Sequence, residues 1–478
     1  MFRSTLATVV MILVPPVALA QDAKSVIDAA SKAMGVDTLR TVEYSGSGSD
    51  FVYGQAYSPT SPWPRFTDKT YTRQIDFQTP ASRMDRVRMQ AENPPRGGGQ
   101  QPIRGEQMQN QTIVVSASTP WVQQLEIWMM PHAFLRAAAM NNATVKSQRA
   151  GGKAYRVLTF TGQNKAAVNG YINDQNLVER VETTIDNPLF GDTALESVYS
   201  DYKDFSGVKF PMHIVQRQGG YPVLDLTITD VKPNAPVNIR PPANAAAAAP
   251  APQGTPSEKL GDGVYLILGG YASLAIDMKD HIVVVEAPQS EERALAVFAE
   301  AKRLIPNKPI RYVINTHHHV DHSSGIRAAM AEGATIITHE VNKPFFEKIA
   351  AAPHMLAPDR LSAVRKKPVI ETMTEKKVLT DGNQVIELHH LAGNGHNAGL
   401  LVVYLPKIKT LLEADAYNPP AQASTPPPTP VSPYTANLVS TMDRLKLDVE
   451  TIIPVHYAAD GRKVTRAELM RVATAGTN

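Results

Sequence analysis

Residues 316–322 of the chain have the sequence THHHVDH, which contains the pattern His-x-His-x-Asp-His. Four side chains that can bind a metal ion therefore lie within six residues. The short run 311–315 before them is largely apolar and predicts a buried strand that ends at the pattern. Imidazole nitrogens and carboxylate oxygens bind first-row metals such as zinc at about 2.0–2.2 Å. Because one ion does not need four ligands from a single segment, the stretch predicts a site for two metal ions.

The composition is that of a globular protein with more than one domain. A length of 478 residues is typical of about two to four domains, and 43% hydrophobic and 19% charged residues are ordinary values for folded proteins. The net charge of +3 gives no electrostatic basis for binding nucleic acid, so we expect none. The chain has no cysteine, which excludes disulfides, a cysteine nucleophile and thiolate metal ligands. A metal site must therefore use His, Asp or Glu.

Residues 1–20 have the features of a signal peptide. Arg3 supplies the positive charge, 6–14 form an apolar core, and the small residues of 18–20 precede a cleavage site before Gln21. The apolar core is too short to span a bilayer, although an uncleaved membrane anchor is the alternative interpretation. We expect a periplasmic or secreted protein whose mature chain has no transmembrane helix.

Residues 21–232 are predicted to form a largely antiparallel β domain. Apolar and polar residues alternate over several short segments, which is typical of half-buried strands, and glycine and proline turns separate them. The predicted strands are 71–77, 83–89, 155–160, 177–183, 198–202 and 224–229. Helices are predicted at 24–34 and 131–140. The order of one helix followed by many strands resembles the bacterial lipoprotein-carrier half-barrels, whose curved sheet can hold an apolar ligand; a plain scaffold is the alternative.

A break in composition separates this domain from the rest of the chain. Residues 233–256 are dominated by Pro and Ala and predict an interdomain linker. In residues 257–478 the predicted strands alternate with helices, as in the strand 282–285 followed by the helix 291–305. This order predicts a layered α/β domain, which contains the metal-binding pattern.

Three further candidate ligands follow the pattern, and each lies at a strand end or in a turn. His396 lies in a glycine-rich turn, Asp415 follows the apolar run 410–414, and His456 follows the apolar run 452–455. Binding and catalytic residues are often found at such positions, because loops at strand ends are held in place by a rigid scaffold.

The His-x-His-x-Asp-His pattern, followed in order by Gly-His, Asp and His, closely resembles the metallo-β-lactamase fold superfamily of metal-dependent hydrolases. The resemblance covers about residues 257–460. It implies a four-layer αββα sandwich for the C-terminal half, with two sheets packed between helices. It also implies that Asp415 bridges two ions and that His318, inside the pattern, points away from them. The resemblance assigns His317, His319 and His396 to the first ion, and Asp321, His322 and His456 to the second.

The sequence departs from the family pattern at two places beside the ligands. Ala414 stands where the family often has Gly before the bridging Asp, and Val455 and Tyr457 flank the last His where the family often has Gly on both sides. Both differences concern the shape of the pocket more than metal binding. A proline-rich stretch, 417–434, follows the bridging Asp and is predicted to be a lid, since long irregular stretches inside a domain are often functional. Tyr417, Asn418 and Tyr457 are candidate substrate-binding residues, with loop packing as the alternative for the first two.

The ligand set predicts hydrolytic chemistry. A bound metal ion lowers the pKa of water toward about 7 and polarises a substrate oxygen, so no Ser or Cys nucleophile is required. We expect two zinc ions, with iron or manganese as alternatives, and Asp321 as the catalytic residue that orients the hydroxide as well as binding metal. The predicted function is that of an exported hydrolase that acts on an ester, thioester, lactone or related bond of a small molecule.

The bridging position bears on the alternatives to this function. In the β-lactam-cleaving members of the superfamily it is typically not Asp, whereas in the thioesterase, lactonase and phosphodiesterase-like members it is. Asp415 therefore favours the second set of activities. Three alternatives stay open at this point: a β-lactam hydrolase, an iron-dependent oxidoreductase on the same fold, and a non-catalytic lipid-binding or carrier protein. The sequence identifies neither the substrate nor the oligomeric state.

Overall fold

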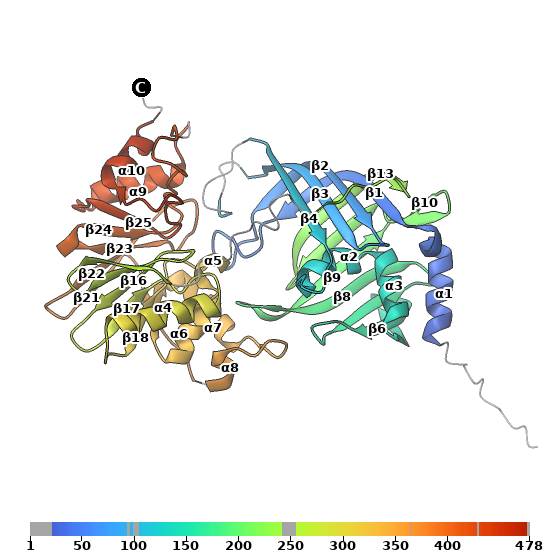
Figure 1. The fold of residues 1–478 in the computed structure, drawn as a ribbon, viewed down its shortest axis with the longest axis horizontal. Helices are drawn as coiled ribbons and strands as arrows, with labels where there is room; N and C mark the ends of the chain where they lie inside the picture. The colour runs from blue at the N-terminus through green and yellow to red at the C-terminus, as the bar shows by residue number, and fades with distance from the viewer. Residues whose placement is uncertain are drawn as a thin grey trace, which may run out of the picture.

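The computed structural model describes residues 22–92, 96–98, 105–240, 255–364, 366–427 and 430–475. Figure 1 shows an N-terminal β domain and a C-terminal α/β domain side by side, which meet near α5 (Val320–Ser323). The predicted signal peptide, 1–20, and residues 241–254 of the predicted linker lie outside the described residues. In the described part of the chain, no helix is both long and apolar enough to cross a membrane.

Among the described residues, eleven strands of the N-terminal domain form one continuous sheet in the order β4-β3-β2-β1-β13-β12-β9-β8-β7-β6-β5. Its strands are β1 (Thr41–Phe51), β2 (Arg65–Asp76), β3 (Ala81–Gln90), β4 (Gln107–Val114), β5 (Thr144–Ala150), β6 (Lys153–Thr161), β7 (Ala167–Ile172), β8 (Val178–Asn187), β9 (Gly191–Ser200), β12 (His213–Gln218) and β13 (Tyr221–Pro233). A separate hairpin pairs β10 (Lys203–Phe205) with β11 (Val208–Phe210). Because these strand pairs are antiparallel, the prediction of a largely antiparallel β domain is confirmed.

Helices pack against one face of this sheet, which curves around α2 and α3 in Figure 1. They are α1 (Ala23–Met34), α2 (Trp121–Trp128) and α3 (Pro131–Met140), and the short helix η1 (Val36–Thr38) follows α1. Phe134 of α3 is fully buried against β7, where a side chain in place of Gly170 would lie within 2.1 Å of the Phe134 ring. The predicted helices 24–34 and 131–140 are confirmed to within a residue, whereas α2 was not predicted. The resemblance to lipoprotein carriers stays a prediction.

The C-terminal domain contains two sheets, with strand orders β14-β15-β16-β17-β18-β19-β20 and β21-β22-β23-β24-β25-β26. The first consists of β14 (Ser257–Gly261), β15 (Val264–Ile267), β16 (Ser273–Asp277), β17 (Ile282–Val285), β18 (Ile310–Ile314), β19 (Thr335–His339) and β20 (Val369–Met373). The second consists of β21 (Lys376–Thr380), β22 (Val385–His390), β23 (Leu401–Leu405), β24 (Thr410–Glu413), β25 (Thr451–Pro454) and β26 (Val464–Thr465). The helices are α4 (Glu291–Leu304), α5, α6 (Ile326–Glu332), α7 (Lys343–Ala351), α8 (Arg360–Val364), α9 (Pro433–Arg444) and α10 (Arg466–Ala473), with the short helices η2 (Glu340–Asn342) and η3 (Pro406–Ile408).

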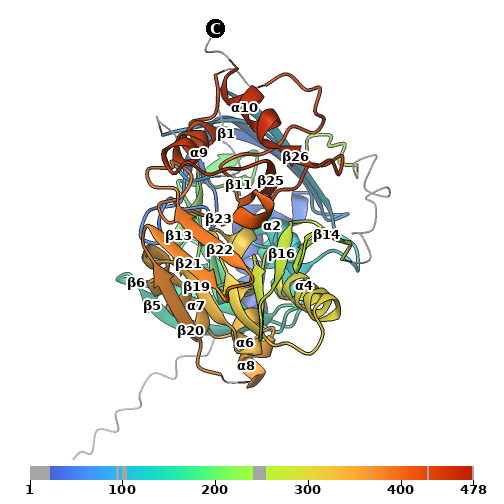
Figure 2. The same cartoon turned by 90° about the vertical axis from the view of Figure 1, so that its left-hand side faces the viewer.

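The residues of β17 show why the two sheets stack between helices. Side chains alternate across a strand, so successive residues face opposite sides of the sheet. Ile282 and Val284 lie in the apolar cluster that contains α4 and α6, whereas Val283 and Val285 lie in the cluster that contains the strands of the second sheet. α9 and α10 pack on the other face of the second sheet. Figure 2 shows this order of helix, sheet, sheet and helix, and the predicted four-layer sandwich is confirmed.

The N-terminal domain reaches the C-terminal domain through residues 52–64, which connect β1 to β2 and are termed the covering segment. The amide of Ala398 donates to the carbonyl oxygen of Tyr57 at 2.7 Å, and the amide of Val320 donates to that of Gly54 at 3.3 Å. Both partners in the C-terminal domain are close to candidate metal ligands in the sequence. The covering segment therefore lies against the predicted metal site.

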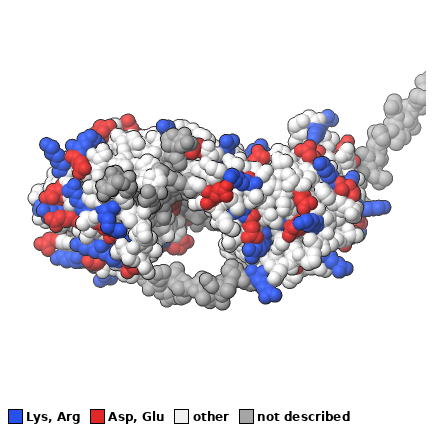
Figure 3. All heavy atoms as spheres, turned by 90° about the horizontal axis from the view of Figure 1, so that it is seen from above, with Lys and Arg blue, Asp and Glu red and all other residues white. Residues whose placement is uncertain are grey.

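A second contact joins the start of β9, and the turn before it, to the loop between α7 and α8. The amide of Asp192 donates to the carbonyl oxygen of Pro353 at 2.8 Å, and the carboxylate of Asp192 accepts the amides of Met355 and Leu356. Leu189 is buried in the apolar cluster of α4 and α6. A further contact joins the amide of Gly97 to the carbonyl oxygen of Gly395 at 2.9 Å, so the two domains are held together at several separate points. Figure 3 shows Lys and Arg mixed with Asp and Glu over both domains.

Candidate metal centre

The candidate ligands lie beyond strand ends in the two facing sheets. The stretch 317–322 follows β18, which is parallel to β17 and β19 in the first sheet. In the second sheet His396 follows β22, Asp415 follows β24 and His456 follows β25, and β24 is parallel to β25. The carboxyl ends of parallel strands meet at the same sheet edge, which is where α/β proteins bind ligands.

Seven side chains form two groups there. The first group contains His317, His319 and His396, and the second contains Asp321, His322, Asp415 and His456. Each residue offers one nitrogen or carboxylate oxygen, and within a group these atoms lie within 4.8 Å of one another. The structure thus brings together all seven residues that the sequence singled out as metal ligands.

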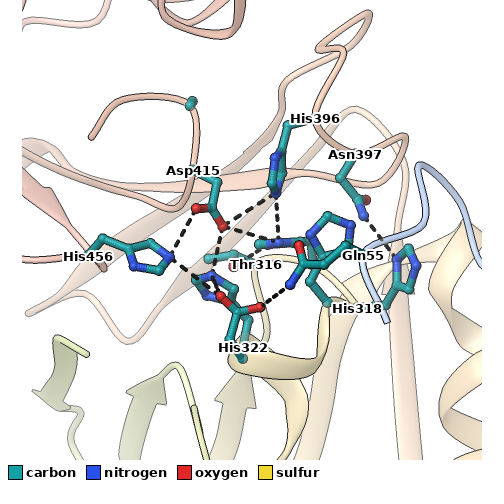
Figure 4. A network of polar contacts seen from close by, with 12 residues as sticks. Gln55, Thr316, His318, His322, His396, Asn397, Asp415 and His456 are labelled. Atoms are coloured by element: carbon teal, nitrogen blue, oxygen red, sulfur yellow. Dashed lines mark hydrogen bonds and ion pairs between the residues drawn. The ribbon is translucent and has the colours of Figure 1, made fainter. Parts of the chain in front are cut away.

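Asp415, a member of the second group, also lies close to the first group (Figure 4). Its Oδ2 is 3.4 Å from Nε2 of His317, 3.4 Å from Nε2 of His396 and 2.8 Å from Nε2 of His322. Its Oδ1 is 3.0 Å from Nε2 of His456. Asp415 has a left-handed backbone with φ of 59°, which non-glycine residues rarely adopt. With this backbone conformation just after β24, the carboxylate of Asp415 faces both groups.

The spacing of the facing atoms fits a metal site. In a tetrahedral zinc site with bonds of about 2.0–2.1 Å, neighbouring ligand atoms are about 3.3 Å apart. Nε2 of His317 and Nε2 of His396 are 3.2 Å apart, and Oδ2 of Asp321 is 3.5 Å from Nε2 of His322. Nδ1 of His319 is buried and has no hydrogen-bond partner in the described part of the chain. Atoms at these distances from one another are arranged to share an ion.

The protonation states of His317, His319 and Asp415 favour metal binding as well. Burial, together with the neighbouring imidazoles, holds the pKa values of His317 and His319 well below their usual range, so both rings are neutral and have a free lone pair. Burial alone would raise the pKa of Asp415, but the imidazoles around it outweigh this effect and hold the pKa well below its usual range. Neutral imidazoles and an ionised carboxylate are the forms that bind metals.

Glu286 forms a hydrogen bond that orients His322 of the second group. Its carboxylate accepts hydrogen bonds from Nδ1 of His322 at 2.8 Å and from the amide of Thr316 at 2.8 Å. A carboxylate that accepts the outer N–H of a ligand histidine fixes the ring tautomer and directs the other nitrogen toward the metal. Glu286 is fully buried and has a left-handed backbone with φ of 72°.

Two further residues contact Asp321, and one of them comes from the other domain. The hydroxyl of Tyr271 donates to Oδ2 of Asp321 at 2.8 Å, and the side-chain amide of Gln55 donates to Oδ1 at 2.8 Å. Next to Gln55 in the covering segment, the carbonyl oxygen of Ala56 accepts Nε2–H of His319 at 2.8 Å. The N-terminal domain therefore orients one residue of each ligand group.

The structure places the remaining predicted residues as follows. His318 belongs to neither group; its Nδ1 is 3.0 Å from the side-chain nitrogen of Asn397, and Figure 4 shows it apart from the ligands. Tyr417 is buried in the apolar cluster of α9 and α10, and its hydroxyl donates to Glu468 at 3.2 Å, so packing accounts for it without a substrate. Asn418 is buried and Tyr457, beside a ligand, is half-buried. The irregular stretch of the predicted lid ends before 434, because α9 begins at Pro433.

Sequence reasoning missed the supporting residues Gln55, Tyr271 and Glu286. A signal existed for Glu286, because it is a single carboxylate directly after the apolar run 282–285. A buried charge at such a position requires a partner. Gln55 precedes its partner Asp321 by 266 residues, and nothing in its surrounding sequence indicates the contact.

Comparisons with known proteins agree with this description. Residues 272–456 match the family model of the metallo-beta-lactamase superfamily. Among solved structures, a metallo-beta-lactamase from Pontibacter korlensis is 16% identical with a TM-score of 0.36, and the match covers 47% of this chain and 99% of that chain. A metallo-beta-lactamase from Hirschia baltica is 20% identical with a TM-score of 0.35, with 46% and 97% covered. The comparison with curated proteins found no match.

The match of residues 272–456 includes every member of both ligand groups. The same region forms most of the two facing sheets and carries the groups at one edge of them. The resemblance that the motif implied is thereby confirmed for the C-terminal half. The C-terminal domain of this chain has the metallo-beta-lactamase fold, and its residues 272–456 match the model of the metallo-beta-lactamase superfamily.

Proposed function

We propose that the protein is an exported hydrolase with two metal ions, zinc in the first place, that cleaves an ester, thioester, lactone or related bond of a small molecule. The observation that carries the proposal is the position of Asp415, whose Oδ2 lies within 3.4 Å of nitrogens from both ligand groups. A shared carboxylate of this kind supports two neighbouring ions rather than one. Export is proposed from the signal-peptide features of 1–20.

Two ions, when bound, would lower the pKa of water and polarise the carbonyl oxygen of the substrate. The residues of the chain supply position and proton control around them. Asp321 presents Oδ2 toward the second group, while Gln55 holds Oδ1 in place at 2.8 Å. With the side chain of Asp321 about one quarter exposed (26%), it is the ligand that solvent and substrate can best reach. Asp321 is therefore suited to orient the attacking hydroxide as well as to bind metal.

The substrate class rests on two features of the site. Asp415 at the shared position favours ester-type substrates over β-lactams, as the family pattern implies. The covering segment contacts His319 and Asp321 through Ala56 and Gln55 and so covers part of the metal centre. We therefore expect a small molecule as substrate.

The proposal is tested by assaying purified protein, loaded with zinc, against chromogenic esters, thioesters, lactones, phosphodiesters and β-lactams. We expect turnover of at least one ester-type substrate, and we expect Asp321→Ala to reduce it about 1,000-fold or more, in the range that single catalytic groups contribute. Asp262→Ala, which removes an exposed carboxylate of the same domain, is the control and leaves turnover unchanged. Full activity in Asp321→Ala, or iron with oxygen consumption in place of hydrolysis, contradicts the proposal.

A further inference from the structure

A cavity of about 500 Å³ lies between the two domains, next to the covering segment, and is termed the interdomain pocket. Five aromatic side chains line it: Tyr53, Trp63, Phe190, Tyr221 and Phe345. Phe345 belongs to α7 of the C-terminal domain, and the other four belong to the N-terminal domain. Cavities of about 300–1,000 Å³ with aromatic walls and few polar groups are typical of small-molecule sites.

The aromatic rings form a row that runs toward the metal-binding motif. The ring centroids of Trp63 and Tyr53 are 4.5 Å apart, and those of Tyr53 and Phe190 are 5.4 Å apart. Phe190 lies 5.9 Å from Phe345, which lies 5.1 Å from His318 of the motif. The four aromatic side chains of this row are only half-buried, so they present apolar surface to the cavity. Aromatic walls of this kind bind planar rings by stacked and edge-on contacts.

Two charged side chains line the pocket, and their surroundings differ. The carboxylate of Asp192 accepts the amides of Met355 and Leu356 at 2.9 and 3.0 Å, so its charge is already compensated by hydrogen bonds. Lys348 of α7 is exposed and forms no ion pair within the described part of the chain. The pocket therefore combines apolar walls with one cation that can pair with a ligand.

We propose that the interdomain pocket binds a small organic anion with a planar aromatic body. The rings of Trp63 and Phe345 contact the aromatic body from opposite domains, and Lys348 pairs with a carboxylate or sulfonate group. The pocket is distinct from the metal centre, because Gly54 and Ala56 line the pocket while Gln55 between them contacts Asp321. Binding at this site does not require hydrolytic activity.

The test is a fluorescence titration of the full-length protein with 1-anilinonaphthalene-8-sulfonate, an aromatic sulfonate. We expect saturable binding, and Ala194→Trp, which fills the pocket from the exposed Ala194, weakens it about tenfold. Trp63→Ala has the same effect. Lys348→Met weakens binding about fivefold but leaves the affinity for the uncharged N-phenyl-1-naphthylamine unchanged.

Lys343→Met is the matched control, because Lys343 is exposed on the same helix but does not line the pocket. It leaves the affinity for both probes unchanged. Asp321→Ala also keeps wild-type affinity, so loss of hydrolysis and loss of this site are separate results. Wild-type affinity for the sulfonate in both Ala194→Trp and Trp63→Ala, or equal effects of Lys348→Met and Lys343→Met, overturns the proposal.

Discussion

Asp321 has different partners at its two carboxylate oxygens. Oδ2 lies 3.5 Å from Nε2 of His322 and accepts the hydroxyl of Tyr271 at 2.8 Å, while Oδ1 accepts the amide of Gln55 at 2.8 Å. An amide donates without carrying a charge, so Gln55 fixes the orientation of the carboxylate without neutralising it. Gln55 is accordingly a positioning residue that acts through Asp321.

Replacing Gln55 by Leu is expected to weaken metal binding in the second ligand group. Loss of an outer hydrogen bond to a metal ligand typically costs about 10- to 100-fold in metal affinity or activity. Metal competition with a chromogenic chelator measures the affinity of the protein for each ion. In Gln55→Leu, the ion held by the second group is expected to bind less tightly than the ion held by the first. Ser58→Ala, a polar change in the same segment away from the ligands, is the control. Equal loss of both ions, or no loss, contradicts the role of Gln55.

Asp68 provides a pH-dependent prediction in the N-terminal domain. Burial, with a smaller effect from Asp50, raises the pKa of Asp68 to about 7, although Arg86 and Arg88 oppose the shift. A raised carboxyl pKa stabilises the fold while the group is protonated, and this contribution is lost as pH rises from about 4 to about 7, by about 4 kcal/mol at most.

Asp68→Asn removes this pH dependence. The variant is therefore expected to gain thermal stability relative to wild type as the pH is raised from about 5 to about 8. The midpoint of thermal denaturation, followed by circular dichroism, measures the difference. Asp85→Asn, a half-buried carboxylate on the adjacent strand, is the control. A difference between Asp68→Asn and wild type that stays constant over this pH range would show that the pKa of Asp68 is not raised.

At the residue scale, the side chains that could be predicted from the sequence are those whose type and spacing are characteristic of metal binding. His317 and the other ligand residues stand out because few packing roles need imidazoles and carboxylates in that pattern. Gln55 and Tyr271 could not be predicted, since an amide and a phenol are common residues and their contacts join distant parts of the chain. Tyr417 was proposed near the substrate on position alone, whereas its hydroxyl contacts Glu468 of α10.

At the scale of elements, hydrogen bonds from the covering segment join the two domains. Its backbone contacts Val320 and Ala398, and its Ala56 carbonyl orients His319. The close approach depends on Gly54, which has φ of 70° and whose position leaves no room for a side chain: a Cβ there would lie 1.7 Å from Cγ1 of Val320. The segment therefore fits the metal centre only with glycine at this position.

Gly54→Ala is expected to displace the covering segment from the motif. The clash with Val320 adds about 1–3 kcal/mol to the cost of the left-handed backbone, so the thermal midpoint falls by about 5 °C. Gly461→Ala is the control, because it has φ of 73° but open space around its Cβ. Thermal denaturation of both variants separates the clash from the backbone cost. Equal midpoints for the two variants would show that the covering segment does not depend on the glycine.

Elements with a regular apolar pattern were predicted well, and elements formed by long-range pairing were not. β17 and β18 follow from continuous apolar runs, and α4 from helical spacing. β1 contains Gly46 and Gly48, which lack the side chains that mark a strand. It forms because it pairs with β13, about 180 residues later, where a side chain at Gly46 would meet the carbonyl oxygen of Thr227 at 2.2 Å.

At the scale of the whole molecule, the site belongs to both domains. The sequence separated a β domain from an α/β domain by composition and periodicity, but it contained no information on how they meet. The structure shows that the first domain supplies Gln55 and Ala56 to the ligand residues of the second. The same junction forms the interdomain pocket, so the proposed metal centre and the proposed ligand site depend on one arrangement of the domains.

The central claim is that two metal ions are held by two ligand groups that share Asp415. The most direct test is the metal content per chain, measured by mass spectrometry after zinc loading and removal of excess metal. We predict about two ions per chain for wild type and for the control Asp262→Asn, and fewer than about one for Asp415→Asn, because both ions lose a ligand. Wild-type protein that retains no metal, or Asp415→Asn that retains as much as wild type, would contradict the claim.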